Sequence, residues 1–319
     1  GYSNSNYNFN IGGGGIWDAS GNWFTGIMDE VAVWDTTLSA EAIIELYSGN
    51  SLLSNSHYYQ ESSDLIAYWN FNENSGDIAY DYSGNDNDGT IYGGSRVTYV
   101  PDDSLKQALI VLGYDDVLDD YVVTDSISGV TTLNVSNDSI SDLTGIEDFT
   151  ALTTLFCSNN ALTALDISSN TALINFDCGY NSLTSLDVSS NTALTGLGCY
   201  SNELTSLDVS NNTALIALQL QSNFLTSLDI SSNIALDHLD VQNNQLTSLD
   251  VSNNTALAHL NNSVNNLDSL DVSANTALTR LECNHNDLTN LDVTNNVNLT
   301  RLNTYGNALA VSYTHLTLP

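Results

Sequence analysis

One phrase of 21 residues returns through the second half of the chain without an insertion. Its leading leucine recurs at Leu152, Leu173, Leu194, Leu215, Leu236, Leu257, Leu278 and Leu299. Each turn reads L-x-x-L-x-C-x-x-N-x-L-T-S-L-D-V-S-x-N-T-A with small variations. A fixed period of this length is the signature of a solenoid, in which each repeat packs only against its neighbours. The sequence therefore predicts a stack of equal rungs over residues 151–309.

The two halves of the phrase are similar to each other. The first half matches the leucine-rich repeat pattern, and the second half, LDVSxN, echoes it. Residues 130–309 resemble bacterial leucine-rich repeats of the short, nested type. This resemblance implies a leucine-rich-repeat solenoid with parallel strands, so we expect a mainly β fold.

Position within the repeat predicts which side chains are buried. Leu155 and Cys157 alternate with Thr154 and Phe156, so the first two are expected to point inward and the others outward. An asparagine column is expected to satisfy backbone groups at the turns, and a second column, from Asn170 to Asn296, at the other corner. The first column comprises Asn160, Asn181, Asn202, Asn223, Asn244, Asn265, Asn286 and Asn307.

The four cysteines share one phase of the repeat, at Cys157, Cys178, Cys199 and Cys283. Leu220 and Val241 hold the same phase in other rungs, which marks it as a core position. Parallel Cβ atoms on neighbouring rungs lie about 4.8 Å apart, outside the usual range for a disulfide. We therefore expect buried free thiols and no metal site there.

The outward positions of the first half vary, whereas TSLDVSxNTA in the second half hardly changes. Variation on a rigid scaffold can encode ligand selectivity, and neutral drift on a solvated sheet is the alternative. Two of the four basic residues share one outward phase with two histidines, and such a cluster could meet a carboxylate or sulfate group. The candidate ligand-binding residues are Asn175, Asp177, Tyr180, Tyr200, Gln219, His238, Asp240, His259, Asn261, Arg280, Glu282 and Arg301.

Seven aspartates occupy a phase that should face solvent: Asp166, Asp187, Asp208, Asp229, Asp250, Asp271 and Asp292. Like charges stacked about 4.8 Å apart repel one another, so something must offset the repulsion. Nearby hydroxyls, such as those of Thr184 and Ser185, are the expected hydrogen-bond donors. The alternative is neutralisation by divalent cations such as calcium.

Residues 1–95 have a different composition, rich in glycine and aromatic residues. The stretch GIMDEVAVWDTTLSAEAIIELYSG, residues 26–49, predicts a strand, a turn and a short helix between Ser39 and Gly49. It is similar to the closing strand and helix of a laminin-G-like, concanavalin-type jelly roll, which implies a partial β-sandwich. Residues 65–94 resemble another motif of such domains, and they either close this sandwich or open a second one.

The jelly-roll family includes both lectin-like binders and glucanases. Glucanases of this architecture carry carboxylates spaced E-x-D-x-E on one face of a strand. Here Asp29 and Glu30 are adjacent, so they would point to opposite faces. Neither G-x-S-x-G nor H-E-x-x-H occurs in the sequence. We therefore expect no catalytic residues and no enzyme activity.

The loop DYSGNDNDG offers a candidate metal site. Asp81, Ser83, Asn85 and Asp88 place oxygen-bearing side chains around Gly84, as loops that bind hard cations do. Calcium is the one cofactor that this pattern favours. A turn held by Asx side chains without metal is the alternative.

The segment between the two regions predicts a cap. PDDSLKQALIVLGY, residues 101–114, places Leu105, Leu109 and Leu112 on one helical face. Because a solenoid needs its first rung covered, residues 96–150 are expected to form the capping helix and irregular first repeats. At the other end, residues 310–319 break the repeat, and VSYTHLTLP resembles a translated sequencing-adapter read-through. We read the chain as a fragment of a longer protein.

Charge excludes several classes of partner. With Lys+Arg 4 against Asp+Glu 38, the formal net charge of -34 argues against nucleic acid and anionic membranes, and no apolar run predicts membrane insertion. The repeat resemblance implies an extracellular or cell-surface module for adhesion to a protein or glycan ligand. The alternatives are an accessory carbohydrate-binding region of a secreted polysaccharide-degrading enzyme, and a structural stalk.

Overall fold

The computed structural model describes residues 31–40, 43, 65–71, 78–90 and 95–310. The chain forms two compact units, Gly1–Gly94 and Ser95–Pro319. The repeats lie in the second unit, and the segment that resembles a jelly roll lies in the first.

The first unit holds two small antiparallel sheets among its described residues. Strand β1 (Val31–Trp34) pairs with β2 (Leu65–Trp69), and β3 (Ile78–Ala79) pairs with β4 (Gly89–Thr90). A sandwich needs two larger sheets packed face to face, and the described residues of this unit do not form one. Asp29, Glu30 and most of residues 1–64 lie outside the described part, so the jelly roll stays a prediction.

The pairing of β1 with β2 joins two segments that the sequence left separate. It brings the strand of residues 26–49 and the first strand of residues 65–94 into one sheet. The expected helix after β1 also begins as predicted, since the Ile43 N–H donates to the Ser39 carbonyl at 3.1 Å. Its expected end near Gly49 lies outside the described residues.

A helix packs against the start of the solenoid core, with Leu105 and Leu109 in the same buried cluster as Leu133. Helix α2 (Asp103–Val111) begins at Asp102, whose Oδ1 accepts hydrogen bonds from the backbone N–H groups of Ser104 and Leu105 at 2.9 Å. The Oδ2 of Asp102 accepts from the Ser141 N–H and hydroxyl and from the Asp142 N–H. One carboxylate thus starts the helix and ties it to the first irregular turn.

The helix buries a narrower face than the sequence predicted. Leu105 and Leu109 are fully buried, but Leu112 is 44% exposed because it lies at the C-cap, beyond the packed face. Lys106 is buried instead, and its ammonium group contacts Asp115, Asp119 and the Tyr121 carbonyl. The rest of the cap is β5 (Val97–Tyr99), β6 (Tyr121–Val123), α3 (Thr124–Ile127) and the 3-10 turn η2 (Ile146–Asp148).

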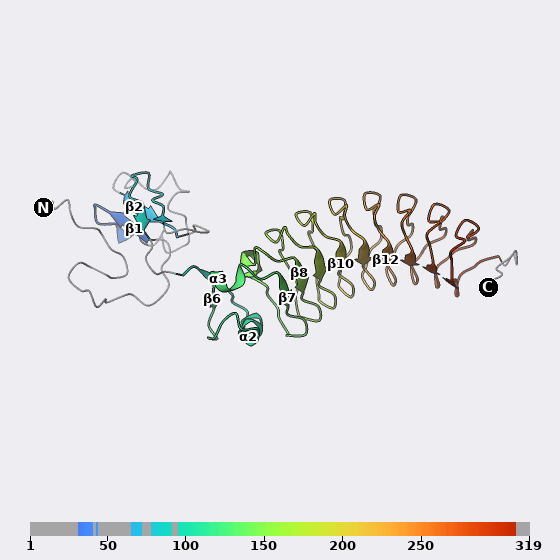
Figure 1. Cartoon of the computed structure of the whole chain (residues 1–319), viewed down its shortest axis with the longest axis horizontal. Coiled ribbons are helices and arrows are strands. Elements are labelled where there is room, and N and C mark those ends of the chain that lie inside the picture. Colours follow the sequence, from blue (N-terminus) through green and yellow to red (C-terminus); the bar gives the residue numbers. More distant parts are fainter. Residues whose placement is uncertain (1–30, 41–42, 44–64, 72–77, 91–94, 311–319) are drawn as a thin grey trace. The chain divides into compact units, whose positions relative to one another are not determined.

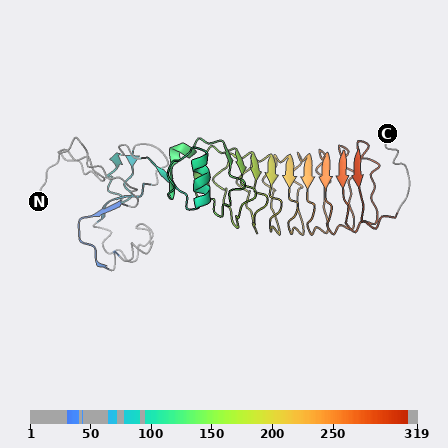
Figure 2. The same ribbon diagram turned by 90° about the horizontal axis from the view of Figure 1, so that it is seen from below.

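The repeats form a single parallel sheet of nine strands, one strand from each rung (Figures 1 and 2). It begins with β7 (Thr132–Asn134) and β8 (Thr154–Phe156). The strands that follow are β9 (Asn175–Asp177), β10 (Gly196–Gly198), β11 (Ala217–Gln219), β12 (His238–Asp240), β13 (His259–Asn261), β14 (Arg280–Glu282) and β15 (Arg301–Asn303). Neighbouring strands pair in register, so equivalent residues of successive repeats lie side by side.

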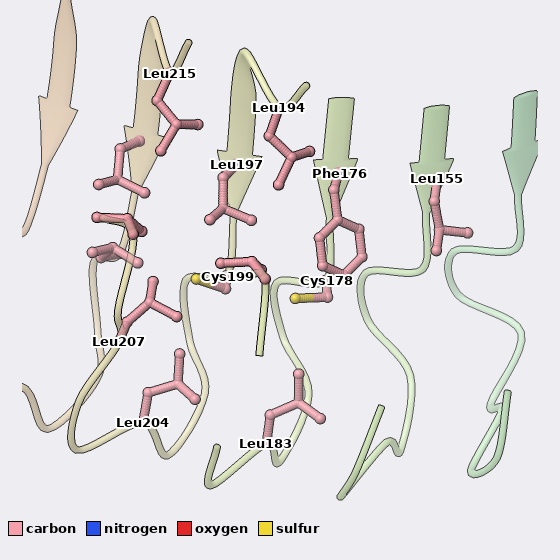
Figure 3. Close-up of a cluster of buried hydrophobic side chains, with 14 of the residues drawn as sticks. Leu155, Phe176, Cys178, Leu183, Leu194, Leu197, Cys199, Leu204, Leu207 and Leu215 are labelled. Atoms are coloured by element: carbon pink, nitrogen blue, oxygen red, sulfur yellow. The ribbon is translucent and has the colours of Figure 1, made fainter. Parts of the chain in front are cut away.

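The interior is a column of stacked aliphatic side chains. Leu155, Leu197 and Cys199 are at most 2% exposed, and Figure 3 shows that they point to the same side of their strands, together with Phe176. The predicted alternation of inward and outward residues is therefore confirmed. Each buried aliphatic side chain contributes about 1.5–3 kcal/mol of transfer free energy, and the repeat supplies several per rung.

All four cysteines are free and buried in this column, as the phase of the repeat predicted. Burial raises the pKa of each thiol well above its ordinary value, and to about 12 for Cys283. The thiols consequently act as small apolar groups.

The first asparagine column bonds the turns as predicted. Asn202 Nδ2 donates to the carbonyls of Cys178 at 3.0 Å and Cys199 at 3.2 Å, and its Oδ1 accepts from the Leu183 N–H at 2.9 Å. The second column performs only half of this role. Asn212 Nδ2 donates to the carbonyls of Val188 and Asn191, both at 2.9 Å, while its buried Oδ1 has no hydrogen-bond partner among the described residues.

The turn after each strand needs a left-handed residue. Seven non-glycine residues occupy this position with φ between 51° and 60°: Asn159, Tyr180, Ser201, Ser222, Asn243, Val264 and His285. In the next rung Gly306 takes the place at φ 74°. Val264 stands out, because a β-branched residue adopts this conformation only at a steric cost.

Candidate functional site

The varying outward residues form two rows across the sheet, which we call the strand surface. The first row is Asn175, Gly196, Ala217, His238, His259, Arg280 and Arg301, and the second is Asp177, Gly198, Gln219, Asp240, Asn261, Glu282 and Asn303. In-register pairing of β9 to β15 places each residue beside its equivalent in the next rung. The strand surface therefore presents a continuous set of residues that vary along the solenoid, on strands whose backbones are hydrogen-bonded to one another.

The predicted cluster of basic residues and histidines lies at one end of this surface. His238 pairs in register with His259, His259 with Arg280, and Arg280 with Arg301. The Nδ1 atoms of the two histidines lie 3.3 Å apart, and their rings meet edge to face at 81°. The structure thus brings together the four residues that the sequence grouped by phase.

The two arginines are not free cations. Both guanidinium groups contact the same carboxylate oxygen, Oε1 of Glu282, at 3.1 Å from Arg280 and 2.8 Å from Arg301. Glu282 is 7% exposed, whereas the arginine side chains are 44% and 60% exposed. An anionic ligand would therefore meet two exposed guanidinium edges already held in place by one buried carboxylate.

The second row continues this polar network toward the histidines. Asp240 accepts hydrogen bonds from the Gln242 N–H at 3.0 Å and from Asn261 Nδ2 at 3.2 Å. Burial raises the pKa of Asp240, and its hydrogen bonds only partly oppose this effect. Burial, followed by the neighbouring His259, lowers the pKa of His238. Burial thus disfavours the charged form of both groups.

An aromatic pair lies at the other end of the strand surface. The rings of Tyr180 and Tyr200 meet edge to face with centroids 5.4 Å apart, and Tyr180 is 59% exposed. The Tyr200 ring lies across Gly179, where an added Cβ would come within 2.5 Å of it, and its hydroxyl donates to Asp177 Oδ2 at 3.1 Å. Burial, with Asp177 as the next cause, raises the pKa of Tyr200 to about 12. Tyr200 is thus fixed, whereas Tyr180 is open to a ligand.

One aromatic contact was not predicted from the sequence. The rings of His285 and Tyr305 meet edge to face with centroids 5.3 Å apart, next to Gly306. It repeats the geometry of the tyrosine pair on the turns beside β14 and β15. The repeat contains a signal for it, because His285 and Tyr305 occupy the two turn positions that Tyr180 and Tyr200 occupy in earlier rungs.

The loop of the candidate calcium site uses its oxygens for backbone contacts. Asp81 Oδ1 accepts from the N–H groups of Tyr68 and Ser83 at 2.9 Å, and its Oδ2 accepts from Asn87 N–H at 2.9 Å. Burial raises the pKa of Asp81, but these hydrogen bonds and the Ser83 hydroxyl outweigh it and lower the pKa to about 2. The geometry is that of a turn held by an Asx side chain.

The remaining loop residues also take part in this turn. Asp88 Oδ1 accepts from the Asp81 N–H at 2.8 Å, and Asn85 Nδ2 donates to the Leu65 carbonyl at 2.7 Å. Calcium binding here stays a prediction. Across the described part of the chain, no three His, Cys, Asp or Glu side chains gather closely enough to hold a metal ion.

The aspartate column faces solvent, but its hydrogen-bond donors differ from those expected. Asp187 Oδ1 accepts from the N–H of Ser189, two residues onward, at 2.8 Å, and not from Thr184 or Ser185. The hydroxyl and N–H of Ser189 lower the pKa of Asp187, and the same pattern recurs in the six other members. A nearby serine hydroxyl is thus a donor, as predicted, but it belongs to Ser189 because the turn that follows carries residue i+2 back over the carboxylate.

Comparisons with known proteins place the solenoid among leucine-rich repeats. No family model and no curated protein matches the chain. The functional domain of InlJ from Listeria monocytogenes, described as including a cysteine ladder, is 30% identical over 66% of this chain with a TM-score of 0.34. The chain spans 62% of the length of that domain.

Two other solved structures align better. Internalin C2 of Listeria monocytogenes is 19% identical with a TM-score of 0.53, over 66% of this chain and 100% of that one. The LRR ectodomain of the receptor kinase GASSHO1/SCHENGEN3 from Arabidopsis thaliana is 25% identical with a TM-score of 0.50, over 56% of this chain and 24% of that one. Among the described residues, no helix is long and apolar enough to cross a membrane. The likeness to internalin C2 and to the receptor-kinase ectodomain, together with the parallel sheet, shows that the repeats of this chain have the fold of a leucine-rich-repeat solenoid.

Proposed function

We propose that this chain is a non-catalytic binding module that holds a protein partner against the strand surface. The observation that carries the proposal is the contrast between the two halves of each rung. The second half of the repeat, TSLDVSxNTA, hardly changes, whereas the outward residues of β9 to β15 in the first half vary from rung to rung. A rigid sheet with a specific set of exposed side chains is suited to selective recognition.

Chemically distinct contacts are available at the two ends of the strand surface. Tyr180 offers an exposed aromatic ring, and tyrosine and arginine are enriched among residues that dominate binding energy. Arg280 and Arg301 offer exposed guanidinium edges fixed by Glu282, which suit a carboxylate on the partner. A partner with an acidic group and an apolar group at matching positions would use both ends.

A structural neighbour supports a protein as the partner. The aligned receptor-kinase ectodomain was solved in complex with CASPARIAN STRIP INTEGRITY FACTOR 2. By analogy with that ectodomain, and with the bacterial repeats that the sequence resembles, we place this chain outside the cell or at the cell surface. A jelly-roll unit before the solenoid and a calcium ion in the loop at Asp81 belong to the same proposal.

The experiment compares variants of the full chain for binding to an array of extracellular proteins and to a glycan array. Replacing Arg280 and Arg301 by serine should lower affinity for the partner at least about tenfold, since each charge-assisted contact contributes about 1.5–3 kcal/mol. Tyr180→Ala should have a similar effect. The matched control, Glu203→Ser with Asp268→Ser, removes two exposed charges away from the strand surface and should leave binding unchanged.

Equal binding by the arginine double variant and the control would refute a role for the basic end. Binding to a glycan instead of any protein would favour the carbohydrate-binding alternative, and binding to neither would favour the structural stalk.

A further inference from the structure

The imidazole rings of His238 and His259 lie close together on the strand surface, an arrangement that protein binding does not require. His238 opens β12 and His259 opens β13, and the two residues pair directly in the parallel sheet. Their side chains project from the same face, and their Nδ1 atoms lie 3.3 Å apart. His259 is exposed and His238 is partly exposed, so both rings are open to solvent on this face.

This separation is the one that a shared metal ion imposes on two imidazole ligands. Zinc binds imidazole nitrogen at about 2.0–2.1 Å in tetrahedral geometry, which sets two coordinating nitrogens about 3.3 Å apart. We propose that His238 and His259 form a two-histidine site for a first-row transition metal ion such as Zn²⁺. Imidazole is a ligand that zinc, copper and nickel accept, whereas magnesium and calcium prefer oxygen.

The scaffold pre-organises the two ligands. In-register pairing fixes the spacing of the two Cα atoms, and hydrogen bonds to the neighbouring rungs hold the backbone of both strands. The χ2 torsion of histidine is broad, so each ring can turn its Nδ1 lone pair toward a common point. Binding therefore requires a small ring rotation and no movement of the sheet.

The groups around the pair favour a cation on balance. Asp240 lies two residues after His238 on the same face, and Asp237 precedes it, so two carboxylates are near the proposed ion. Arg280 on the neighbouring strand acts in the opposite sense, but its guanidinium contacts Glu282. The oxygens of Asp240 already accept hydrogen bonds from Gln242 and Asn261, so we assign it an electrostatic role and not a place among the ligands.

Two protein ligands leave the other coordination positions to water or to an acidic or histidine side chain of another molecule. The site is therefore open, on the face where we propose that a partner binds. Metal binding by the chain alone does not depend on that proposal, so failure of one is distinguishable from failure of the other.

The test is calorimetric titration of the full chain with ZnCl₂ in excess Mg²⁺, which occupies the many carboxylates of this acidic protein. We expect one strong site. His259→Ala should weaken it on the order of 100-fold, because the second ligand acts at a high effective concentration once the first has bound. His285→Ala removes a histidine that lies on a turn beside Tyr305 and should change nothing. The other histidines, His57 and His315, are present in every variant, so any zinc that they bind contributes equally to each titration.

A spectroscopic measurement identifies the ligands directly. In ¹⁵N-labelled protein, zinc should shift the Nδ1 resonances of His238 and His259 together, and leave those of His285 in place. If the pair is only a hydrogen bond between two rings, zinc will bind wild type and His259→Ala with equal affinity, or will not bind at all. Either result would overturn the proposal, as would a shift confined to His285.

Discussion

Arg301 of β15 reaches across to β14 and places its guanidinium 2.8 Å from the carboxylate of Glu282. The same oxygen accepts Arg280 at 3.1 Å, so one buried acid lies between two like charges on adjacent strands. Without it, the two arginines would stand in register about 4.8 Å apart at the backbone and would repel each other.

Replacing Glu282 by glutamine should therefore destabilise the last rungs. We expect a loss of about 1 kcal/mol, a modest value because both arginines are largely exposed to solvent. The loss should shrink as NaCl is added, since salt screens the repulsion left behind. Urea unfolding of wild type, Glu282→Gln and the exposed control Glu203→Gln, each at low and high salt, measures it. A loss that does not change with salt would show that packing, and not charge, is responsible.

A second prediction concerns Val264, the β-branched residue in the left-handed turn. Its φ of 55° is a conformation that valine adopts at a cost of about 1–2 kcal/mol. Asn243 holds the same turn position at the same φ one rung earlier, so Val264→Asn should relieve the strain. We expect stability to rise by about 1 kcal/mol.

The melting temperature of Val264→Asn checks this expectation. Ile234→Asn is the matched control, because Ile234 is an exposed β-branched residue outside the left-handed positions. If both variants gain equally, the benefit comes from removing an exposed apolar side chain and not from the backbone.

The repeat makes most of the solenoid predictable from the sequence. Residues at the same phase of the repeat share one environment. The alternation at Leu155 and Cys157 therefore predicted which residues face inward on the other strands, and the phase of Asn202 correctly predicted its role in the turn. The adjacency of His238, His259, Arg280 and Arg301 followed from the same register. Side-chain partners did not, since the approach of both arginines to Glu282 depends on rotamers that the period does not determine.

Other features depend on geometry that the pattern does not contain. A serine donor to the aspartate column was predicted, but not its position at Ser189, because the turn after Asp187 folds back in a way that strand alternation cannot indicate. In the first unit, pairing between β1 and β2 spans a long stretch of chain with no repeating phase. A predicted strand there has no neighbour assigned by the sequence, so the sandwich could be inferred only from resemblance.

The aspartate column leads to a prediction about acid stability. Hydrogen bonds from serine or threonine two residues onward hold the pKa of all seven carboxyl groups below the ordinary value of 3.8. A folded-state pKa below the unfolded one adds stability that is complete above the unfolded pKa, about 3.9, and is lost as pH falls through the folded pKa. The solenoid should therefore lose stability steeply below about pH 4.

Asparagine at Asp187, Asp208 and Asp229 keeps a side-chain oxygen for the turn but does not titrate over this range. The triple variant should show a shallower fall in the free energy of unfolding between about pH 4 and 2. Measurement of urea midpoints across that range compares the two slopes. A rise in stability on acidification would mean that repulsion within the column outweighs its hydrogen bonds.

The last prediction ranks the two asparagine columns by what each removal leaves unpaired. Asn202→Ala removes three hydrogen bonds and leaves the buried Leu183 N–H without its partner, while the Cys178 and Cys199 carbonyls each keep a donor from a neighbouring asparagine. It should cost about 3 kcal/mol. Asn212→Ala removes two hydrogen bonds to carbonyls that each keep a backbone N–H donor, and it also removes a buried Oδ1 that has no partner among the described residues. Its cost should be smaller, about 2 kcal/mol. Both side chains are at most 6% exposed, so cavity formation is comparable and the difference reports the hydrogen bonds. Urea unfolding of the two variants measures the order directly. If Asn212→Ala proved the more damaging, a buried water bonded to its Oδ1 would have to be part of the structure of that corner.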